Sequence, residues 1–173
     1  MKSAAEIKDH PLHPMLIVVP AGAFIITLVL DIGFLISGEP LWWDATKPVM
    51  MIGVVGAIVA AIPGTIDLFK VARPAGAFKI GLAHMVINLI VVALFVFNFV
   101  LRANLAAPRA GVPPEFWLTL AGAALLGVSG WLGWAMVYKY RVGVSDEEVP
   151  GIERRREAAE PPELYDEPGA EPA

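Results

Sequence analysis

The sequence predicts an all-α integral membrane protein, a four-helix bundle with up-down-up-down topology. Hydrophobic residues make up 57% of the 173 residues and charged residues only 17%, whereas an average soluble domain is about 45–50% apolar and about 25% charged. The apolar residues gather in four segments, each about as long as the roughly 20 residues that a helix needs to cross a bilayer core. These segments are about 14–36, 47–69, 80–101 and 116–138.

Each segment is expected to be a spanning helix, because a helix satisfies its own backbone hydrogen bonds where lipid offers none. The connections between the segments are short, which favours antiparallel neighbours and therefore an up-down-up-down order. Orientation follows from lysine and arginine, which collect in cytoplasmic loops. One side of the predicted topology holds Lys2, Lys8, Lys70, Arg73, Lys79, Lys139 and Arg141, and the other only Lys47, Arg102 and Arg109. We therefore expect both termini in the cytoplasm.

Charge separates a membrane domain from a tail. The net charge is −4, yet residues 144–173 alone hold ten acidic and three basic residues, while the rest of the chain has ten basic and seven acidic ones. A polar, acidic segment with prolines buries too little apolar surface to fold. We expect a cytoplasmic N-terminal segment over 1–13, a transmembrane domain over 14–143 and a disordered acidic cytoplasmic tail over 144–173.

Several kinds of function are excluded by composition. The chain has no cysteine, which rules out disulfides, thiolate zinc sites and a cysteine nucleophile. No basic nucleic-acid surface is present. No serine triad, acid–base pair or phosphate-binding loop can be picked out, so an enzyme is not the expected class. The partners that remain are the lipid bilayer, a redox or membrane-complex protein, and a second copy of the chain.

Small and aromatic residues predict how the helices pack and where they meet the membrane surface. Lipid gives no hydrophobic drive between helices, so small residues mark their contacts. In the second and fourth segments these are Gly53, Ala57, Ala60 and Gly64, and Ala123, Gly127, Gly130 and Gly133. Ser129 is expected to serve packing only. Pro20 and Pro63 should bend their helices. Trp42, Trp43 and Trp117 are expected as aromatic anchors at the outer interface.

The third segment carries four polar residues on one face. Counted from His84 at 100° per residue, Asn88, Asn98 and Arg102 lie within about 40° around the helix axis. In the first segment, His13 and Asp31 are eighteen residues apart, as His84 and Arg102 are. The first and third helices run in the same direction. If they lie side by side, His13 comes level with His84, and an Asp31–Arg102 ion pair forms at the outer end.

The inner end gathers all three histidines of the chain, His10, His13 and His84, together with Asp67. Three interpretations stay open. The first is a polar seam in which the imidazoles bind backbone carbonyls while Asp67 caps a segment or pairs with a cation, Lys70 or Arg73. The second is a b-type haem held by His13 and His84, with His10 and Asn88 as further cofactor-binding candidates. The third is a zinc or iron site formed by His10, His13, Asp67 and His84.

Several stretches together resemble a bacterial membrane-protein family, domain of unknown function 2231. They are HPLHPMLIVVPAGAFIITLVLD (10–31), WWDA (42–45), GAIVAAIPGTIDLF (56–69), AHMVINLIVVALFVFNFVLR (83–102) and SGWLGWAMVYKYRVGV (129–144). The resemblance covers roughly residues 10–144 and implies a four-helix protein of the bacterial inner membrane with unassigned activity. Some members of the family accompany, or are fused to, redox modules such as Rieske or cytochrome b5-like domains.

That association favours haem b and electron transfer, by analogy alone. Many relatives carry a histidine in the fourth helix at the position of Ala135, which cannot bind a metal. If that histidine serves a cofactor in the relatives, this chain either has lost the site or uses other ligands. The leading hypothesis is a redox-associated membrane component that binds haem b through His13 and His84. The alternatives are a cofactor-free structural or assembly subunit of a membrane complex, and the metal site.

Overall fold

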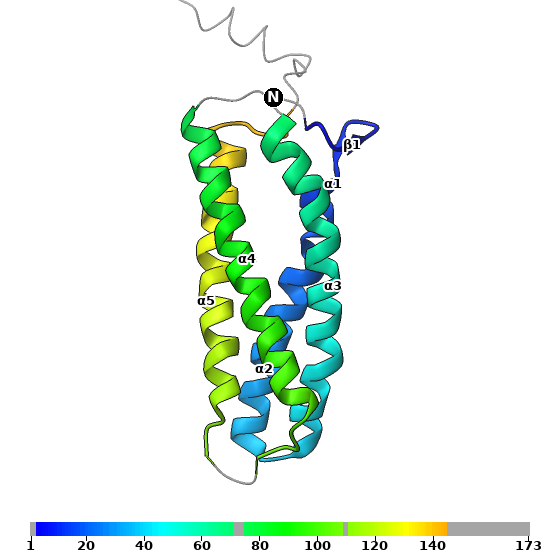
Figure 1. Ribbon diagram of the computed structural model, residues 1–173, viewed down its shortest axis with the longest axis vertical. Coiled ribbons are helices and arrows are strands. Elements are labelled where there is room, and N and C mark those ends of the chain that lie inside the picture. The colour runs from blue at the N-terminus through cyan, green and yellow to red at the C-terminus, as the bar shows by residue number, and fades with distance from the viewer. Residues whose placement is uncertain (1–2, 71–74, 109–110, 145–173) are drawn as a thin grey trace, which may run out of the picture.

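The computed structural model describes residues 3–70, 75–108 and 111–144. In this part of the chain, four long helical rods run alternately up and down beside one another (Figure 1). The helices are α1 (Leu12–Leu16), α2 (Val18–Ser37), α3 (Pro40–Lys70), α4 (Ala75–Ala103) and α5 (Pro114–Trp134), which continues into the π-helix η1 (Ala135–Lys139). The acidic tail predicted for residues 144–173 lies outside the described residues except for Val144.

Four spans, as the sequence predicts, are confirmed by length and composition. They are Leu12–Ser37, Pro40–Lys70, Ala75–Ala103 and Pro114–Lys139. Only 17 to 28% of the most apolar window of each span is buried inside the bundle. Many of the other apolar side chains are exposed on the outside of the bundle, which suits contact with lipid and would be costly in water. The predicted fold class, a helical membrane bundle, is therefore correct.

The helices extend beyond the apolar segments from which they were predicted. The largest difference is at α3, which begins at Pro40 rather than near residue 47. Hydropathy marks only the part of a helix that lies in lipid, whereas the hydrogen-bonded helix continues into the polar interface. Proline is well suited to the first turn because its missing N–H would be unpaired there. The same reasoning explains the start of α5 at Pro114.

Pro20 interrupts the first rod, whereas Pro63 does not interrupt α3. Helix α1 ends at Leu16 and α2 begins at Val18. Pro20 has no N–H to donate to the carbonyl four residues earlier, that of Leu16, so the helix is weakened at this turn. Helix α3 remains one element through Pro63. The part of the first rod that carries His13 is thus a short helix of its own.

A small antiparallel hairpin precedes α1. Strands β1 (Glu6–Ile7) and β2 (His10–Pro11) pair through a tight turn in which Lys8 and Asp9 both have positive φ, 50° and 63°. Two consecutive left-handed residues are the signature of a type I′ turn, which matches the twist of a two-stranded hairpin. The hairpin lies at the end of the bundle where the N-terminus is found (Figure 1).

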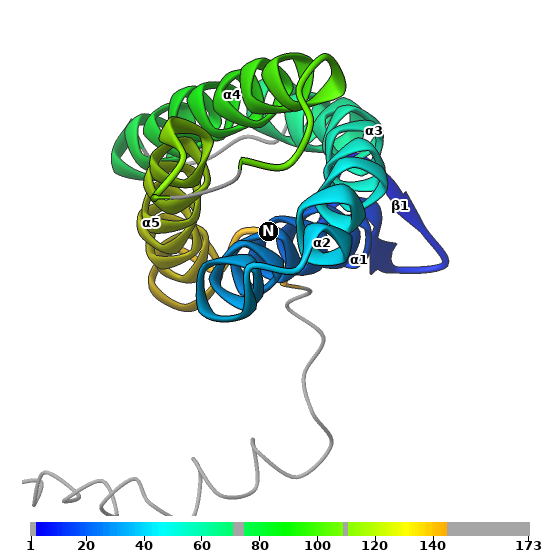
Figure 2. The same cartoon turned by 90° about the horizontal axis from the view of Figure 1, so that it is seen from below.

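The four rods form a closed ring in the order α2, α3, α4, α5 (Figure 2). Helices α2 and α4 are therefore diagonal, so the first and third spans are not adjacent helices of the ring, although their side chains come level as the spacing predicted. Contact between them is made by side chains that meet at the centre of the ring. Because up-down-up-down topology makes consecutive helices neighbours, the two parallel helices must face each other across the bundle.

Three pairs of side chains bridge this diagonal. The imidazoles of His13 and His84 have ring centroids 6.3 Å apart, and the rings of Phe24 and Phe95 stack at 3.9 Å. The third pair is Asp31 with Arg102, whose charged atoms approach to 2.6 Å. Phe24 and Phe95 are the centre of the apolar core, with Met50 and Val91 packed around them.

Glycines of α3 and α5 make room for these rings. A Cβ atom on Gly53 would lie 2.5 Å from the ring of Phe24, and one on Gly122 would lie 2.6 Å from the ring of Phe95. Gly127 and Gly130 were predicted to pack against a helix, but a Cβ atom on either would have no neighbour within 4 Å among the described residues. At 100° per residue Gly127 lies about 140° around the helix from Gly122, so it faces outward.

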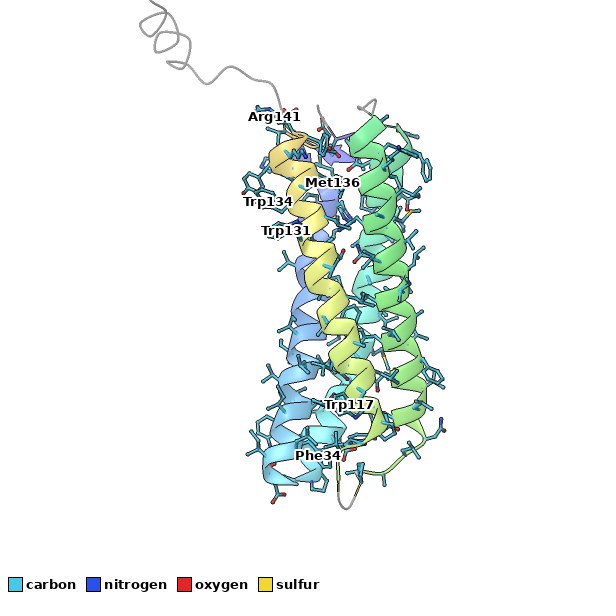
Figure 3. All side chains as sticks on the ribbon, turned by 90° about the vertical axis from the view of Figure 1, so that its left-hand side faces the viewer. Phe34, Trp117, Trp131, Trp134, Met136 and Arg141 are labelled. Carbon is cyan, nitrogen blue, oxygen red and sulfur yellow. The ribbon has the colours of Figure 1, made fainter. Side chains whose placement is uncertain are left out.

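Exposed tryptophans lie near both ends of the bundle, but Trp43, which was predicted to be one of them, is buried. Trp117 is exposed near one end, and Trp131 and Trp134 are exposed near the other (Figure 3), as expected for aromatic residues at two membrane interfaces. Trp42 is also partly exposed. Trp43, however, is completely buried. It is a core residue rather than an interfacial anchor, because it packs beneath Arg102.

Candidate functional site

The Asp31–Arg102 pair is the centre of a polar cluster at one end of the bundle. Arg102 Nη1 donates to Asp31 Oδ1 at 2.6 Å, and Nη2 donates to Asp31 Oδ2 at 2.8 Å. The side chains of Arg102 and Asp31 are 0% and 2% exposed, respectively. A bidentate guanidinium–carboxylate contact is the strongest geometry for such a pair. The structure thus places in contact the two charges whose helical phase suggested an ion pair.

The remaining N–H groups of the guanidinium are directed at three other residues. Nε donates to Asn98 Oδ1 at 2.8 Å, Nη1 to Thr46 Oγ1 at 3.1 Å and Nη2 to Thr119 Oγ1 at a longer 3.5 Å. Guanidinium has five N–H donors. With the two bonds to Asp31 and these three, every donor has an acceptor. Helices α2, α3, α4 and α5 each contribute a partner to this cluster.

The acceptors are themselves held by the backbone. The hydroxyl of Thr46 donates to the carbonyl of Trp43, and that of Thr119 donates to the carbonyl of Glu115. Each threonine oxygen therefore has a lone pair free to accept from Arg102. The Arg102 guanidinium carbon also lies 4.2 Å from the ring centroid of Trp43, a cation–π contact. A group saturated in this way stabilises the bundle and leaves no donor for a ligand.

At the opposite end, His13 and His84 meet at the centre of the bundle. Their rings are nearly perpendicular, with an interplanar angle of 88°. His13 Nδ1 lies 2.8 Å from the carbonyl oxygen of Ala60 on α3. His84 Nδ1 lies 2.9 Å from the carbonyl oxygen of Ser129 on α5. A carbonyl only accepts, so each Nδ1 carries a proton and donates it. In the neutral ring Nε2 then has a free lone pair.

The two imidazoles differ in their polar surroundings. Ser129 Oγ lies 3.0 Å from His84 Nδ1 and accepts from Asn88 Nδ2 at 2.7 Å. The side chain of Ala60, the corresponding neighbour of His13, has no hydroxyl. Asn88 Nδ2 also donates to the backbone carbonyl of His84 at 2.9 Å, so its amide contacts the imidazole of His84 only through Ser129 and supports the site rather than lining it as a ligand. Ser129 was expected to serve packing only, because nothing within its own helix pairs with it. Its partners come from α4.

Asp67 holds the N-terminal segment. Its carboxylate accepts from Ser3 Oγ at 2.8 Å, from the backbone N–H of Ala4 at 2.7 Å and from that of Ala5 at 3.1 Å. The carbonyl of Ala5 in turn accepts from the backbone N–H of Leu12 at 3.0 Å. Asp67 thereby fixes the start of α1, next to His13. Of the roles predicted for Asp67, capping is the one that these contacts show. Arg73, one of its two predicted cationic partners, lies outside the described residues.

His10 is separated from the other two histidines. It is exposed in the hairpin, where its Nδ1 lies 2.7 Å from the carbonyl oxygen of Lys8. Among the residues that the structure describes, no group of three or more histidines and carboxylates is placed to hold a metal ion. The predicted four-residue site of His10, His13, Asp67 and His84 is not assembled, because His10 turns into the hairpin and Asp67 turns to the N-terminal backbone.

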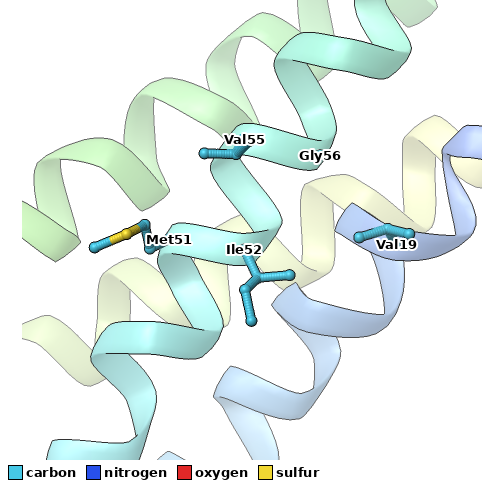
Figure 4. Close-up of a pocket in the computed structure, with 5 residues that line it drawn as sticks. All are labelled: Val19, Met51, Ile52, Val55 and Gly56. Atoms are coloured by element: carbon cyan, nitrogen blue, oxygen red, sulfur yellow. The ribbon is translucent and has the colours of Figure 1, made fainter.

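A shallow apolar hollow of about 340 Å³ lies on the outside of the bundle between α2 and α3 (Figure 4). It is lined by Val19, Met51, Ile52, Val55 and Gly56. None of these residues offers a charged group or a hydroxyl, so the hollow suits an apolar chain and offers no chemistry. The functional candidates are therefore the polar residues at the bundle centre.

Four apolar helices, with a polar pair at each end of their central diagonal, define a polytopic membrane protein. The family model described as predicted membrane protein (DUF2231) matches residues 9–146. The chain belongs to this family, as its resemblance at the sequence level indicated. It has no significant match among curated proteins or among solved structures.

Removing Arg102 should destabilise the protein strongly. Arg102→Ala leaves the carboxylate of Asp31 buried without its partner, a change that typically costs about 3–5 kcal/mol. We expect a clear fall in the thermal unfolding midpoint in detergent. Lys47→Ala is the matched control, since the Lys47–Asp44 pair is exposed and such pairs contribute about 0–1 kcal/mol. Equal midpoints for the two variants would contradict the assignment.

A methyl group at Gly64 should displace His13. The added Cβ would lie 2.7 Å from His13 Nδ1, whereas the ring is held by its bond to Ala60. Overpacking of this kind costs about 1–3 kcal/mol, so Gly64→Ala should lower the unfolding midpoint. Gly127→Ala adds the same methyl on an open face and should leave the midpoint unchanged or raise it. A Gly64→Ala protein as stable as wild type would show that the ring is free to move.

Proposed function

We propose that the protein is a membrane-integral redox component that binds a b-type haem between Nε2 of His13 and Nε2 of His84. The observation that carries this proposal is the geometry of the two imidazoles, which face each other across the bundle centre with their Nδ1 atoms fixed by backbone carbonyls. Histidines that bind a metal usually donate their other N–H to such an acceptor, which fixes the ring and its tautomer.

The spacing of the rings supports one metal atom between them. With metal–nitrogen bonds of about 2.0–2.1 Å, two imidazoles on one atom have centroids roughly 6 Å apart once the ring radii are added. The observed centroid separation is 6.3 Å. Two histidines from facing helices are also the usual way in which a helical bundle holds a cofactor.

The two flanking helices are lined by small residues at the same level. Ala60 and Gly64 of α3 adjoin His13, and Ser129 and Gly133 of α5 adjoin His84. A planar group between the imidazoles would extend toward these two helices, where large side chains would block it. Ala135, which stands where relatives have a histidine, is not needed for this ligand pair.

The bound haem would supply reversible one-electron transfer between its ferrous and ferric states. The chain's own contribution is to hold both imidazoles neutral at Nε2, through the carbonyls of Ala60 and Ser129. The Asp31–Arg102 cluster holds α2 to α4 at the far end of the same diagonal. The electron would be exchanged with a redox protein at the membrane.

We further propose a bacterial inner-membrane location with both termini in the cytoplasm. The excess of lysine and arginine on one side of the topology supports this orientation. The hairpin, the end of α3, the start of α4 and η1 all lie at one end of the bundle (Figure 1), so the lysines on these elements share one membrane face. The histidine pair is then nearer the cytoplasmic side.

The purified protein should bind haem with one-to-one stoichiometry and show a Soret band. His13→Ala and His84→Ala should each abolish low-spin binding, because either change removes one of two axial ligands. The measurement is the absorption spectrum of detergent-solubilised protein after addition of haem, in the oxidised and reduced states.

His10→Ala is the matched control, since His10 lies in the hairpin away from the pair, and it should bind haem as wild type does. A wild-type protein that takes up no haem would overturn the proposal and leave a cofactor-free structural or assembly subunit. Loss of binding in His10→Ala alone would contradict the assignment of ligands.

Cysteine labelling should show the proposed orientation, since the natural chain has no cysteine. Lys8→Cys, in the hairpin, should react with a membrane-impermeant maleimide only after the inner membrane is opened. Glu39→Cys, between α2 and α3, should react in intact spheroplasts. The reverse pattern would invert the topology, and reaction of both in intact spheroplasts would place the two ends of α2 on the same side.

A further inference from the structure

The first and second halves of the membrane domain share a pattern of residues. His13, Phe24 and Asp31 of the first rod correspond to His84, Phe95 and Arg102 of α4, and each pair is 71 residues apart. The residues before the charged position also agree, Val29-Leu30 with Val100-Leu101. In both halves the phenylalanine follows the histidine by eleven residues, and the charged residue follows the phenylalanine by seven.

Helices α3 and α5 show a second constant offset, of 69 residues. Gly53, Ala60 and Gly64 correspond to Gly122, Ser129 and Gly133, and Lys70 corresponds to Lys139. The connection within the second pair of helices is thus two residues shorter than within the first. An offset that stays constant along each of the two helices of a hairpin indicates a repeated unit rather than chance matches on one helix.

Equivalent residues make equivalent contacts. His13 donates to the carbonyl of Ala60 at 2.8 Å, and His84 donates to that of Ser129 at 2.9 Å. Gly53 adjoins Phe24 as Gly122 adjoins Phe95, since a Cβ atom on either glycine would lie 2.5 or 2.6 Å from the ring. Gly64 and Gly133 likewise adjoin His13 and His84, the first more tightly.

The ring of helices has the symmetry that such a repeat requires. In the order α2, α3, α4, α5, a half-turn about the bundle axis exchanges α2 with α4 and α3 with α5 (Figure 2). The three central pairs then lie on the axis. Parallel repeats of this kind, related by an axis along the membrane normal, are known in membrane proteins.

We infer that the membrane domain is a fused pair of two-helix repeats, about residues 12–70 and 83–139, and that His13 and His84 are equivalent ligands on their twofold axis. The part of this inference that concerns ligation rests on the proposed function. It assigns to the site a single six-coordinate iron tetrapyrrole whose two axial imidazoles have crossed planes, as their 88° interplanar angle requires.

The charged pair explains why the two repeats are fused in one chain. In a dimer of identical hairpins, the position of Asp31 on the axis would face a second aspartate. Two buried like charges repel, and one of them would have to be neutral. Fusion allows the two copies to diverge, so that an acid faces a base. Asn98, Thr46 and Thr119 then surround Arg102 alone, so the symmetry is broken in the charges at this end.

Electron paramagnetic resonance of the ferric haem complex tests the ligation. Crossed imidazole planes leave two iron d orbitals nearly equal in energy, which gives one strongly shifted low-field feature instead of three well-separated g values. We expect the single feature. A spectrum with three resolved g values would overturn the crossed, equivalent ligation while leaving haem binding intact. Absence of any haem would overturn the proposed function and, with it, this assignment of the ligand.

A charge exchange tests the repeat without any cofactor. Asp31→Arg and Arg102→Asp should each lower the unfolding midpoint in detergent, because each places two like charges on the axis. The double variant, in which both changes are combined, should recover a large part of that loss, since a half-turn exchanges the two positions. Recovery would be incomplete, because the threonines and Asn98 are placed for an arginine at 102. A double variant no more stable than the single ones would overturn the twofold relation.

Discussion

A single guanidinium connects all four long helices of this protein. Arg102 projects from α4 to the bundle centre, where Asp31 of α2, Thr46 of α3 and Thr119 of α5 accept its hydrogen bonds. In a low-dielectric interior, a charge is tolerated only when it is paired and its other donors are satisfied. The arrangement of the helices is therefore constrained, because each must supply its acceptor at the same height and with the correct phase.

The histidine pair at the other end has a different character. The ring of each imidazole is fixed through Nδ1, while Nε2 has no hydrogen bond among the described contacts. The guanidinium of Arg102 uses every donor, whereas each imidazole of the histidine pair keeps a lone pair on Nε2. This contrast supports the proposal that a cofactor binds at the histidines, while the ion pair holds the helices together.

Asp67 lies at the predicted place, and its contacts match one of its predicted roles, the capping of a segment. It is near the histidines, at the end of α3, as expected from the topology. Its oxygens, however, accept from Ser3 and from backbone N–H groups of the N-terminal segment. Backbone donors carry no signal in the sequence that distinguishes one segment from another. Asp67 therefore holds α1 in place beside the site and is not positioned as a ligand.

Hydropathy and helical phase were sufficient to determine the four spans, their up-down order and the polar stripe from His84 to Arg102, because these depend on the spacing of residues along one helix. The same spacing brought Asp31 level with Arg102. Only the tertiary structure decided that the two parallel helices are diagonal, that Trp43 lies beneath Arg102, and that Gly64 and Ser129 adjoin the imidazoles while Gly127 faces outward. Those contacts join different helices, and their rotation and distance are set by how the side chains of all four fill one centre, which no single segment specifies.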